Sequence, residues 1–422
     1  MKTLRPFLFI VVSACLAGCG GSSSGHSGGG GGGTSTTVTM SFASGTPAVV
    51  AAKIGTGAFA AQSLTAGKLT LSIPSGTTDF AVAYVCSAPS VLSVEHIYEA
   101  TLSDGTSFTL PCVVPEDHPT GPTGALTGNV DMAAISEARQ LILAVSNGTL
   151  ATTFNTAADT AFNLTVPAGT DRVEVLAYDA PSPGLGTTTT LLAARNFDNQ
   201  SVPGALNGGA QVVLGSADRT TLEPITYTNV PAGYSASTFV GLLMANGAGG
   251  FAISQSASQY PALPAGAVES GDSYALIASA RNAAKPTEIM YVAKSATTAG
   301  PVSFAFPTPW AYAGPSPAAL PTFNFNYTGF DQSTNVNQLA SITWGLAPST
   351  QISIEASASF QNGSTTLQIP DLSAIQGFFP APTSGTRVIW VALIGEGGLV
   401  DQQPATTDST ASVTNSGTYT VP

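Results

Sequence analysis

Short stretches in which apolar and polar residues alternate recur along most of the chain. The pattern is clearest in Leu69–Cys86 (LTLSIPSGTTDFAVAYVC) and Phe162–Asp179 (FNLTVPAGTDRVEVLAYD). In each, an alternating run is followed by Pro-x-Gly-Thr and by a second run that ends near a tyrosine. Alternation over a few residues, bounded by Gly and Pro, predicts β-strands rather than helices.

The same pair of strands returns more weakly in the second half of the chain, as ALPAG with GDSYALIASA and as TLQIP with SGTRVIWVAL. Two further strands precede each pair: TVTMSF and AVVAAKI, ALTGNV and QLILAV, PITYTNV and TFVGLLM, PTFNFNY and ASITWGL. Another strand follows the first three pairs (EHIYEAT, TLLAARNF and EIMYVAKS), and a last strand is expected to close every copy (SFTLPCV, AQVVLG, VSFAFP and GTYTVP). The pattern therefore predicts four copies of one arrangement of strands.

A period of about 80–100 residues with roughly seven short strands resembles tandem immunoglobulin-like or fibronectin-like β-sandwiches. We expect an all-β protein of four antiparallel sandwich modules, at residues 38–115, 124–215, 222–313 and 321–422. The expected linkers are rich in Pro, Gly and polar residues: Pro115–Thr123, Ser216–Leu222 and Gly314–Pro321. One large sandwich, or two of double size, is the alternative. The uncharged stretch Ala236–Ser254 is interrupted by Asn246-Gly247, which favours a buried hairpin over a membrane span.

The N-terminus carries a second kind of signal. Lys2 and Arg5 precede a short apolar run and the quartet Leu-Ala-Gly-Cys that ends at Cys19. This layout resembles the signal peptide and lipobox of bacterial lipoproteins. The resemblance implies cleavage after residue 18, acylation of Cys19, and anchoring in membrane lipid. Gly20 in place of aspartate favours the outer membrane in that family. An ordinary secreted protein with a chance cysteine is the alternative.

Residues 19–37 continue from Cys19 into a Gly/Ser-rich run that predicts a flexible tether. Only 9% of the residues are charged, and the net charge is −12. A sparse acidic surface argues against nucleic acid, which requires clustered Lys and Arg. The hydrophobic content of 43% argues against a disordered chain.

Two cysteines remain once Cys15 has left with the signal and Cys19 carries lipid. Cys86 and Cys112 form an even pair in an exported chain, so we expect a disulfide between them. A reactive or metal-binding pair is the weaker alternative, because no further Cys or suitable His lies near. No tryptophan lies between the two cysteines, and this departs from the immunoglobulin pattern.

The sequence shows no motif for nucleophilic, phosphate-binding or zinc chemistry. We therefore expect no catalytic residue, no metal and no cofactor, although paired carboxylates of glycosidase type remain open. His96 alternates with Val94 and Tyr98 on one face of its strand, whereas Glu95 and Glu99 lie on the other. We expect His96 to be a structural residue of the core.

Aromatic residues in loops are the best candidates for ligand contact. Trp310 and Tyr312 follow a closing strand, and Phe378 and Phe379 lie between a glycine and a proline. Exposed rings stack on sugars or anchor protein partners. The alternative is that they pack where modules meet.

These observations favour a non-enzymatic, lipid-anchored protein of the bacterial outer membrane, with a structural or adhesive role. Its partners would be membrane lipid through Cys19 and a surface polysaccharide or protein. A polysaccharide-binding or polysaccharide-degrading lipoprotein is one alternative, and it predicts a cleft with facing carboxylates. A component that assembles a secretion or pilus system is another, and it predicts an unpaired edge strand.

Overall fold

The computed structural model describes residues 35–43, 45–88, 92–112, 122–146, 150–154, 159–179, 190–245, 250–330, 336–345, 349–396 and 410–422. Strands dominate those residues, with helices of no more than four residues, so the all-β prediction is confirmed. The signal, Cys19 and nearly all of the tether lie outside the described residues. Among the described helices, none combines the length and the apolar content needed to cross a bilayer.

The first two groups of strands match the first two predicted repeats. Sandwich 1 comprises β1 (Thr36–Ala43), β2 (Val49–Ile54), β3 (Ala60–Gln62), β4 (Lys68–Ile73), β5 (Asp79–Ala88), β6 (Leu92–Thr101) and β7 (Ser107–Pro111). Sandwich 2 comprises β8 (Thr123–Asp131), β9 (Gln140–Val145), β10 (Leu150–Phe154), β11 (Asp159–Pro167), β12 (Gly169–Tyr178), β13 (Leu191–Val202), β14 (Gly204–Ala205) and β15 (Val212–Val213), with short helices η1 (Leu206–Gly209) and η2 (Ser216–Asp218).

The second half of the chain forms two more groups. Sandwich 3 comprises β16 (Thr221–Thr228), β17 (Tyr234–Leu243), β18 (Gly250–Ser256), β19 (Gln259–Ala262), η4 (Ala265–Ala267), β20 (Ser273–Asn282), β21 (Ile289–Ala296) and β22 (Val302–Ala305). Sandwich 4 comprises β23 (Thr322–Asn324), β24 (Val336–Trp344), β25 (Ser349–Ala356), α2 (Ala358–Gln361), β26 (Thr366–Gln368), β27 (Arg387–Glu396) and β28 (Thr410–Thr420). β17 and β18 pair antiparallel, which confirms the two strands expected in Ala236–Ser254.

The strand order repeats from one sandwich to the next. In sandwich 1, one layer is β4-β1-β7 and the other layer is β3-β2-β5-β6. β1 pairs antiparallel with β4 and parallel with β7. The equivalent layers are β11-β8-β14 and β10-β9-β12-β13 in sandwich 2, and β19-β16-β22 and β18-β17-β20-β21 in sandwich 3. The repeat seen in the sequence is thus a repeat of topology, whereas the domain boundaries that we placed in the linkers stay a prediction.

Sandwich 4 departs from this plan. Its smaller layer is the pair β23-β26, and no third strand joins it among the described residues. We expected the C-terminal GTYTVP to be the last strand of the fourth copy, and it forms the end of the last strand of sandwich 4. These residues belong largely to β28, which pairs with β27 and with β21 in the larger layer. Alternation of side chains identifies a strand but does not determine which layer it joins.

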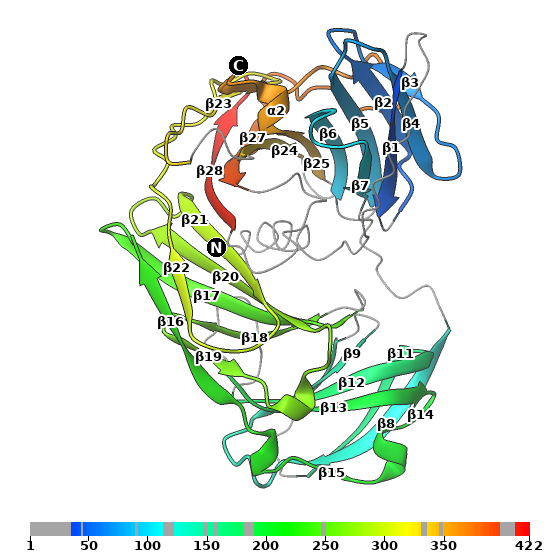
Figure 1. Cartoon of the computed structure of the whole chain (residues 1–422), viewed down its shortest axis with the longest axis vertical. Helices are drawn as coiled ribbons and strands as arrows, with labels where there is room; N and C mark the ends of the chain where they lie inside the picture. Colours follow the sequence, from blue (N-terminus) through cyan, green and yellow to red (C-terminus); the bar gives the residue numbers. More distant parts are fainter. Residues whose placement is uncertain are drawn as a thin grey trace.

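The larger layers of three sandwiches join into one sheet of twelve strands, in the order β18-β17-β20-β21-β28-β27-β24-β25-β6-β5-β2-β3. Sandwich 4 lies at its centre. Its β25 pairs parallel with β6 of sandwich 1, and its β28 pairs antiparallel with β21 of sandwich 3. In Figure 1 the red and orange strands of sandwich 4 lie between the blue strands of sandwich 1 and the green and yellow strands of sandwich 3. Sandwich 2 keeps a separate larger layer, at the bottom of Figure 1.

The buried side chains form three clusters. One fills sandwich 1, around Met40, Leu69 and Phe108, and another fills sandwich 2, around Leu126 and Val175. The third and largest cluster fills sandwiches 3 and 4 and continues onto the outer faces of the larger layers of sandwiches 1 and 2. The four sandwiches are therefore packed against one another through apolar side chains and are not connected by linkers alone.

The predicted disulfide is confirmed. Cys86 at the end of β5 is bonded to Cys112, which directly follows β7. Because β5 and β7 belong to different layers, the bond ties the two layers of sandwich 1 together. Both cysteines are buried.

Candidate functional site

The most elaborate group of charged side chains lies where sandwich 2 meets sandwich 3. It is built on β12, whose residues alternate between two environments. Val173 and Val175 point into the core of sandwich 2, whereas Arg172, Glu174 and Leu176 lie on its other face. That face packs against sandwich 3, so its charged residues are buried at the junction.

One half of this junction is apolar. Leu176 and Tyr178 of β12 belong to the same buried cluster as Phe251 and Ile253 of β18. The hydroxyl of Tyr178 donates a hydrogen bond to the carbonyl oxygen of Ala252. Burial raises the pKa of Tyr178 above its usual range, so the hydroxyl keeps its proton and remains a donor. The apolar half thus packs the two sandwiches directly against each other.

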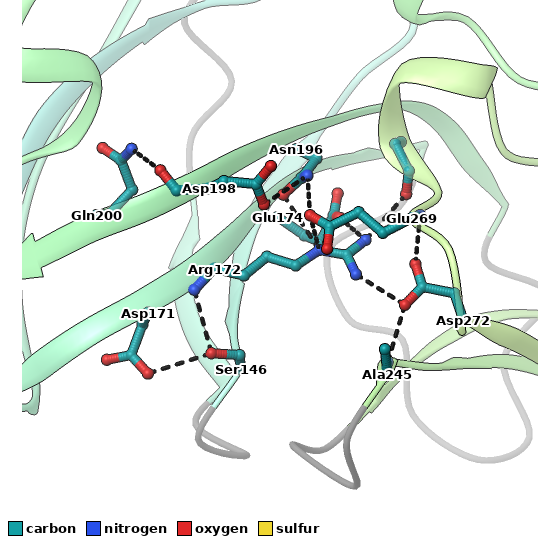
Figure 2. Close-up of polar contacts among 11 residues, drawn as sticks. Ser146, Asp171, Arg172, Glu174, Asn196, Asp198, Gln200, Ala245, Glu269 and Asp272 are labelled. Atoms are coloured by element: carbon teal, nitrogen blue, oxygen red, sulfur yellow. Dashed lines mark hydrogen bonds and ion pairs between the residues drawn. The ribbon is translucent and has the colours of Figure 1, made fainter.

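The other half is an ionic network centred on Arg172, shown in Figure 2. The Nη1 atom of Arg172 lies 2.8 Å from Oδ1 of Asp272, and its Nε atom lies 3.0 Å from Oε1 of Glu174. Glu269 lies 3.4 Å from Nε. Only 8% of the Arg172 side chain is exposed, and the side chains of Glu174 and Asp272 are fully buried. The guanidinium therefore joins a carboxylate of its own strand to two carboxylates from sandwich 3.

Asp272 is held from several directions. Besides Arg172, it accepts hydrogen bonds from the backbone N–H of Ala245 at 2.9 Å and from that of Glu269 at 2.8 Å. Burial alone would raise the pKa of Asp272, but these hydrogen bonds and the charge of Arg172 hold it below its usual value. Asp272 is consequently the fixed anion of the network.

Glu174 is in the opposite situation. Burial raises the pKa of Glu174 to about 7, and the nearby Arg172 offsets only part of this effect. Its Oε1 atom contacts the guanidinium, but its Oε2 atom is buried and has no hydrogen-bond partner among the described residues. An ionised oxygen without a partner is costly to bury. Glu174 is therefore the carboxyl group in the network that most easily retains a proton.

A second pair of carboxyl groups forms the edge of the network. Asn196 of β13 donates from Nδ2 to Glu269 and to Asp198, the latter at 3.0 Å. A hydrogen bond between Asp198 and Glu269 lowers the pKa of Asp198 and raises that of Glu269. Carboxyl groups in direct hydrogen bond leave no space for a sugar, whereas glycosidases separate theirs by about 5 Å or more.

The chemistry of the network is that of an interface. One guanidinium faces four carboxyl groups, which come from β12, from β13 and from the segment before β20. Sequence analysis did not identify it, because its members lie up to 100 residues apart. A local signal was nevertheless present: Arg172 and Glu174 lie two residues apart in an otherwise apolar strand, which places both charges on one face.

The aromatic residues that we selected from the sequence lie elsewhere. Trp310 is only 4% exposed, and its ring stacks on those of Tyr312 and Phe325, with ring centroids 4.6 and 5.4 Å apart. Tyr312 is half-buried and meets the ring of Trp390 edge-on at 5.5 Å. These rings line the core of sandwich 4 beside the two-stranded layer, and the hydroxyl of Tyr312 accepts a hydrogen bond from the N–H of Asn324 on β23.

Phe378 and Phe379 lie where sandwich 4 meets sandwich 1. Phe378 is buried in the cluster that contains Ala83 and Ile97 of sandwich 1, and Phe379 packs against this cluster. The N–H of Phe379 donates a hydrogen bond of 3.0 Å to Oε2 of Glu95 on β6. The structure thus places these two rings at the contact between sandwiches.

His96 lies on the inner face of β6. Its ring stacks on that of Tyr84, with centroids 4.9 Å apart, and burial lowers the pKa of His96 to about 4. Glu95, Ile97 and Glu99 occupy the opposite face of the strand, as the alternation predicted. Among the described residues, no group of three or more His, Cys, Asp or Glu is arranged to hold a metal ion.

Comparison with known proteins gives little. No protein-family model and no curated protein matches the chain. Among solved structures, the chain is similar to the tip fimbrial protein Mfa3 from Porphyromonas gingivalis with C-terminal truncation, at 11% identity and a TM-score of 0.17. The match covers 46% of this chain and 84% of that chain. A score this low is no basis for argument, and nothing about this chain is inferred from it.

Proposed function

We propose that this protein is a lipid-anchored, non-enzymatic protein of the bacterial outer membrane that presents a rigid β-platform for adhesion to a surface polymer or protein. The observation that carries the proposal is the twelve-stranded sheet shared by three sandwiches. A shared sheet transmits force through backbone hydrogen bonds, which suits a protein that must hold its shape while bound to an external partner.

The ladders between sandwiches support this proposal. Eight residue pairs, from Ser349–Leu92 to Ala356–Glu99, join β25 to β6, and five pairs join β28 to β21. Side chains reinforce the first ladder. Asp104 of sandwich 1 accepts a hydrogen bond of 2.7 Å from Ser357, the residue that caps helix α2, and another from Ser359.

The environment of the acidic groups favours a binding role over polysaccharide cleavage. Glu174 is buried against Arg172, Asp272 is held by Arg172 and by backbone N–H groups, and Glu95 is bonded to the N–H of Phe379. Asp272 contacts Arg172 of a second sandwich, and Glu95 contacts a loop of sandwich 4 that docks on sandwich 1. Their positions are those of residues that fix the arrangement of the sandwiches, and loops at the ends of such a platform are the usual sites of binding.

Anchoring is tested by fractionating cells that express the native chain, Cys19→Ala or Cys15→Ala. Cys15 is the matched control, because it precedes the expected cleavage point by four positions. We expect the native chain and the Cys15→Ala variant to fractionate with the outer membrane and the Cys19→Ala variant to be released. If the Cys19→Ala variant stays with the membrane, the proposed lipid anchor is wrong.

Display is tested by adding protease to intact cells. Digestion of the native chain would support adhesion at the surface, and the released Cys19→Ala protein would then be applied to glycan and protein arrays. Protection until the outer membrane is opened would contradict surface adhesion and would favour a periplasmic scaffold. Release of reducing sugar from any glycan on the array would contradict the non-enzymatic role.

A further inference from the structure

Sandwich 2 is attached to the rest of the protein in a different way from the others. Sandwiches 1, 3 and 4 share a sheet, whereas the larger layer of sandwich 2 is separate. Backbone pairing between sandwich 2 and sandwich 3 is limited, among the described residues, to one isolated bridge between Thr190 and Ser254. The remaining contacts are made by side chains, namely the apolar contacts around Tyr178 and the network of Arg172. This junction is therefore the place where two parts of the chain can separate without breaking a sheet.

The charges at this junction do not balance. Arg172 is the one cation that contacts Glu174, Glu269 and Asp272 among the described residues, and Asp198 adds a fourth carboxyl group. The charged groups that act on Glu174 are Arg172 on β12 and Glu269 and Asp272 from sandwich 3. Asn196 and Asp198 on β13 interact with Arg172 and Glu269, and the hydroxyl of Tyr274 interacts with Asp272. The nearby Arg195 is engaged with Asp218 of η2. With all four carboxyl groups ionised, Arg172 balances one of them and the network carries a net charge of −3.

The excess negative charge of the network disfavours ionisation most strongly at Glu174. Its side chain is fully buried, and its Oε2 atom has no partner among the described residues. A neutral carboxyl group at this position contacts Arg172 through Oε1 and leaves an uncharged oxygen facing the interior. An ionised one leaves an unpaired charged oxygen, in addition to repulsion from Asp272 and Glu269. Opening the junction relieves both penalties, because water reaches the carboxylate.

We propose that the junction between sandwich 2 and sandwich 3 is a proton-controlled clasp, closed while Glu174 is neutral and released when Glu174 ionises. Release lets sandwich 2 separate from the platform that the other three sandwiches form. The clasp thus gives the protein two shapes, and the surrounding pH selects between them.

The direction of the pH dependence follows from the pKa of Glu174 in the closed and in the open junction. The closed junction raises the pKa of Glu174 to about 7, whereas exposed glutamate has a pKa near 4.5. A group with a raised pKa in the closed state binds its proton more tightly there, so the closed state gains stability as pH falls from above 7 toward 4.5. It loses that stability as pH rises through about 7. At the edge of the network the pKa of Glu269 is raised and that of Asp198 is lowered, so the pH dependences of these two groups oppose each other.

The test uses the full mature chain with Cys19→Ala, which removes the proposed site of lipid attachment. The disulfide between Cys86 and Cys112 is kept. Spin labels on cysteines that replace Asn163 on β11 and Ser303 on β22, both exposed, report the distance between sandwiches 2 and 3. Labels at Ser303 and Thr366 report on sandwiches 3 and 4, which share a sheet, and serve as the reference. Distance distributions are measured by electron–electron double resonance at pH 6 and at pH 8.5.

We expect the distribution between sandwiches 2 and 3 to be narrow at pH 6 and broad at pH 8.5, with a midpoint near 7, while the reference pair stays unchanged. Glu174→Gln is expected to remain narrow at both pH values, and Asp171→Asn, a neighbour that contacts Ser146 instead of Arg172, to behave as the native chain does. Glu269→Gln removes one of the negative charges that raise the pKa of Glu174, and it is expected to reduce the broadening between pH 6 and pH 8.5. A native distribution that is the same at both pH values would overturn the proposal. So would opening of Glu174→Gln at pH 8.5, or, if that variant fails to fold, a broadening in Glu269→Gln as large as in the native chain.

Discussion

The carboxylate of Glu95 on β6 accepts a hydrogen bond from the backbone N–H of Phe379, 284 residues further along the chain. The loop that carries Phe379 belongs to sandwich 4, and it lies on the outer face of the larger layer of sandwich 1. A Cβ added at Gly377 of this loop would lie 3.2 Å from Val49 of β2. The loop therefore packs closely on sandwich 1, and Glu95 is the buried polar group that fixes its position.

Replacing Glu95 with alanine is expected to lower the free energy of unfolding by about 1–3 kcal/mol, because the N–H of Phe379 would lose its acceptor in a buried site. Glu95→Gln keeps an acceptor and serves as the control. Urea unfolding at pH 6 checks the pair of variants. Equal stability of Glu95→Ala and the native chain would show that the hydrogen bond is replaced by water and that the loop is not held by Glu95.

The same residue predicts a dependence on pH. Burial raises the pKa of Glu95 to about 7, and Asp371 adds to this while the N–H of Phe379 opposes it. The folded state therefore binds the proton more tightly than the unfolded state, and the contribution of Glu95 to stability declines as pH rises through about 7. We expect the stability difference between Glu95→Gln and the native chain to shift in favour of the glutamine variant between pH 6 and pH 8.5. A constant difference would contradict the raised pKa.

Most strands were predictable from the sequence, whereas their assembly was not. Alternation located β4 and β5, and the recurrence of Pro-x-Gly-Thr showed that β11 and β12 form a matching pair. These are local properties. The pairing of β25 with β6 joins residues about 260 positions apart. No short turn connects these two strands, so the sequence contains no local signal that they pair. Both faces of β6 and of β25 carry a mixture of apolar and polar side chains. Their sequences are therefore equally compatible with an edge and with the interior of a sheet.

The candidate site was unpredictable for a similar reason. Arg172 and Glu174 were visible as charges on an apolar strand, but the partners Asp272 and Glu269 belong to another sandwich. Trp310 shows the opposite error, in which a residue expected to be exposed is buried. Its position in a Pro-rich segment is typical of an exposed loop, yet this segment lies on the core of sandwich 4, where Asn415 donates a hydrogen bond of 2.8 Å to its carbonyl oxygen. Composition reports that a segment is irregular, and not whether it is covered.

Breaking the disulfide is expected to destabilise sandwich 1. Cys86 and Cys112 are 26 residues apart, and the chain-entropy model gives about 3.5 kcal/mol for a loop of this length. We expect Cys86→Ala with Cys112→Ala to lower the free energy of unfolding by about that amount, as measured by guanidinium unfolding. Treatment of the native chain with a reductant should reproduce the effect and leave the double variant unaffected. Insensitivity of the native chain to the reductant under unfolding conditions would argue against the bond.

Proline in β25 is expected to uncouple sandwich 1 from sandwich 4. Ser353 lies in the middle of β25, aligned with His96 on β6 and with Ser341 on β24. Ser353→Pro removes a ladder hydrogen bond at a cost of about 1–3 kcal/mol, and its ring crowds the neighbouring strand. Calorimetry should then show an additional transition at lower temperature, whereas Ser353→Thr, which suits a strand, should unfold as the native chain does. A single unchanged transition in Ser353→Pro would mean that the shared ladder does not couple the sandwiches.

Substitutions of Trp310 distinguish a structural role of the aromatic residues from a role in ligand binding. Its ring is 4% exposed and stacks on Tyr312 and Phe325, so Trp310→Ala would leave a large cavity in the core of sandwich 4. Such changes lower the free energy of unfolding by about 3–5 kcal/mol, and we expect Trp310→Phe, which keeps one ring in the stack, to cost less. Denaturant unfolding followed by the fluorescence of Trp344 and Trp390 measures both. If Trp310→Ala instead keeps its stability and loses binding to a glycan or protein found on the arrays, the ring is a ligand contact and its packing in the core is of secondary importance.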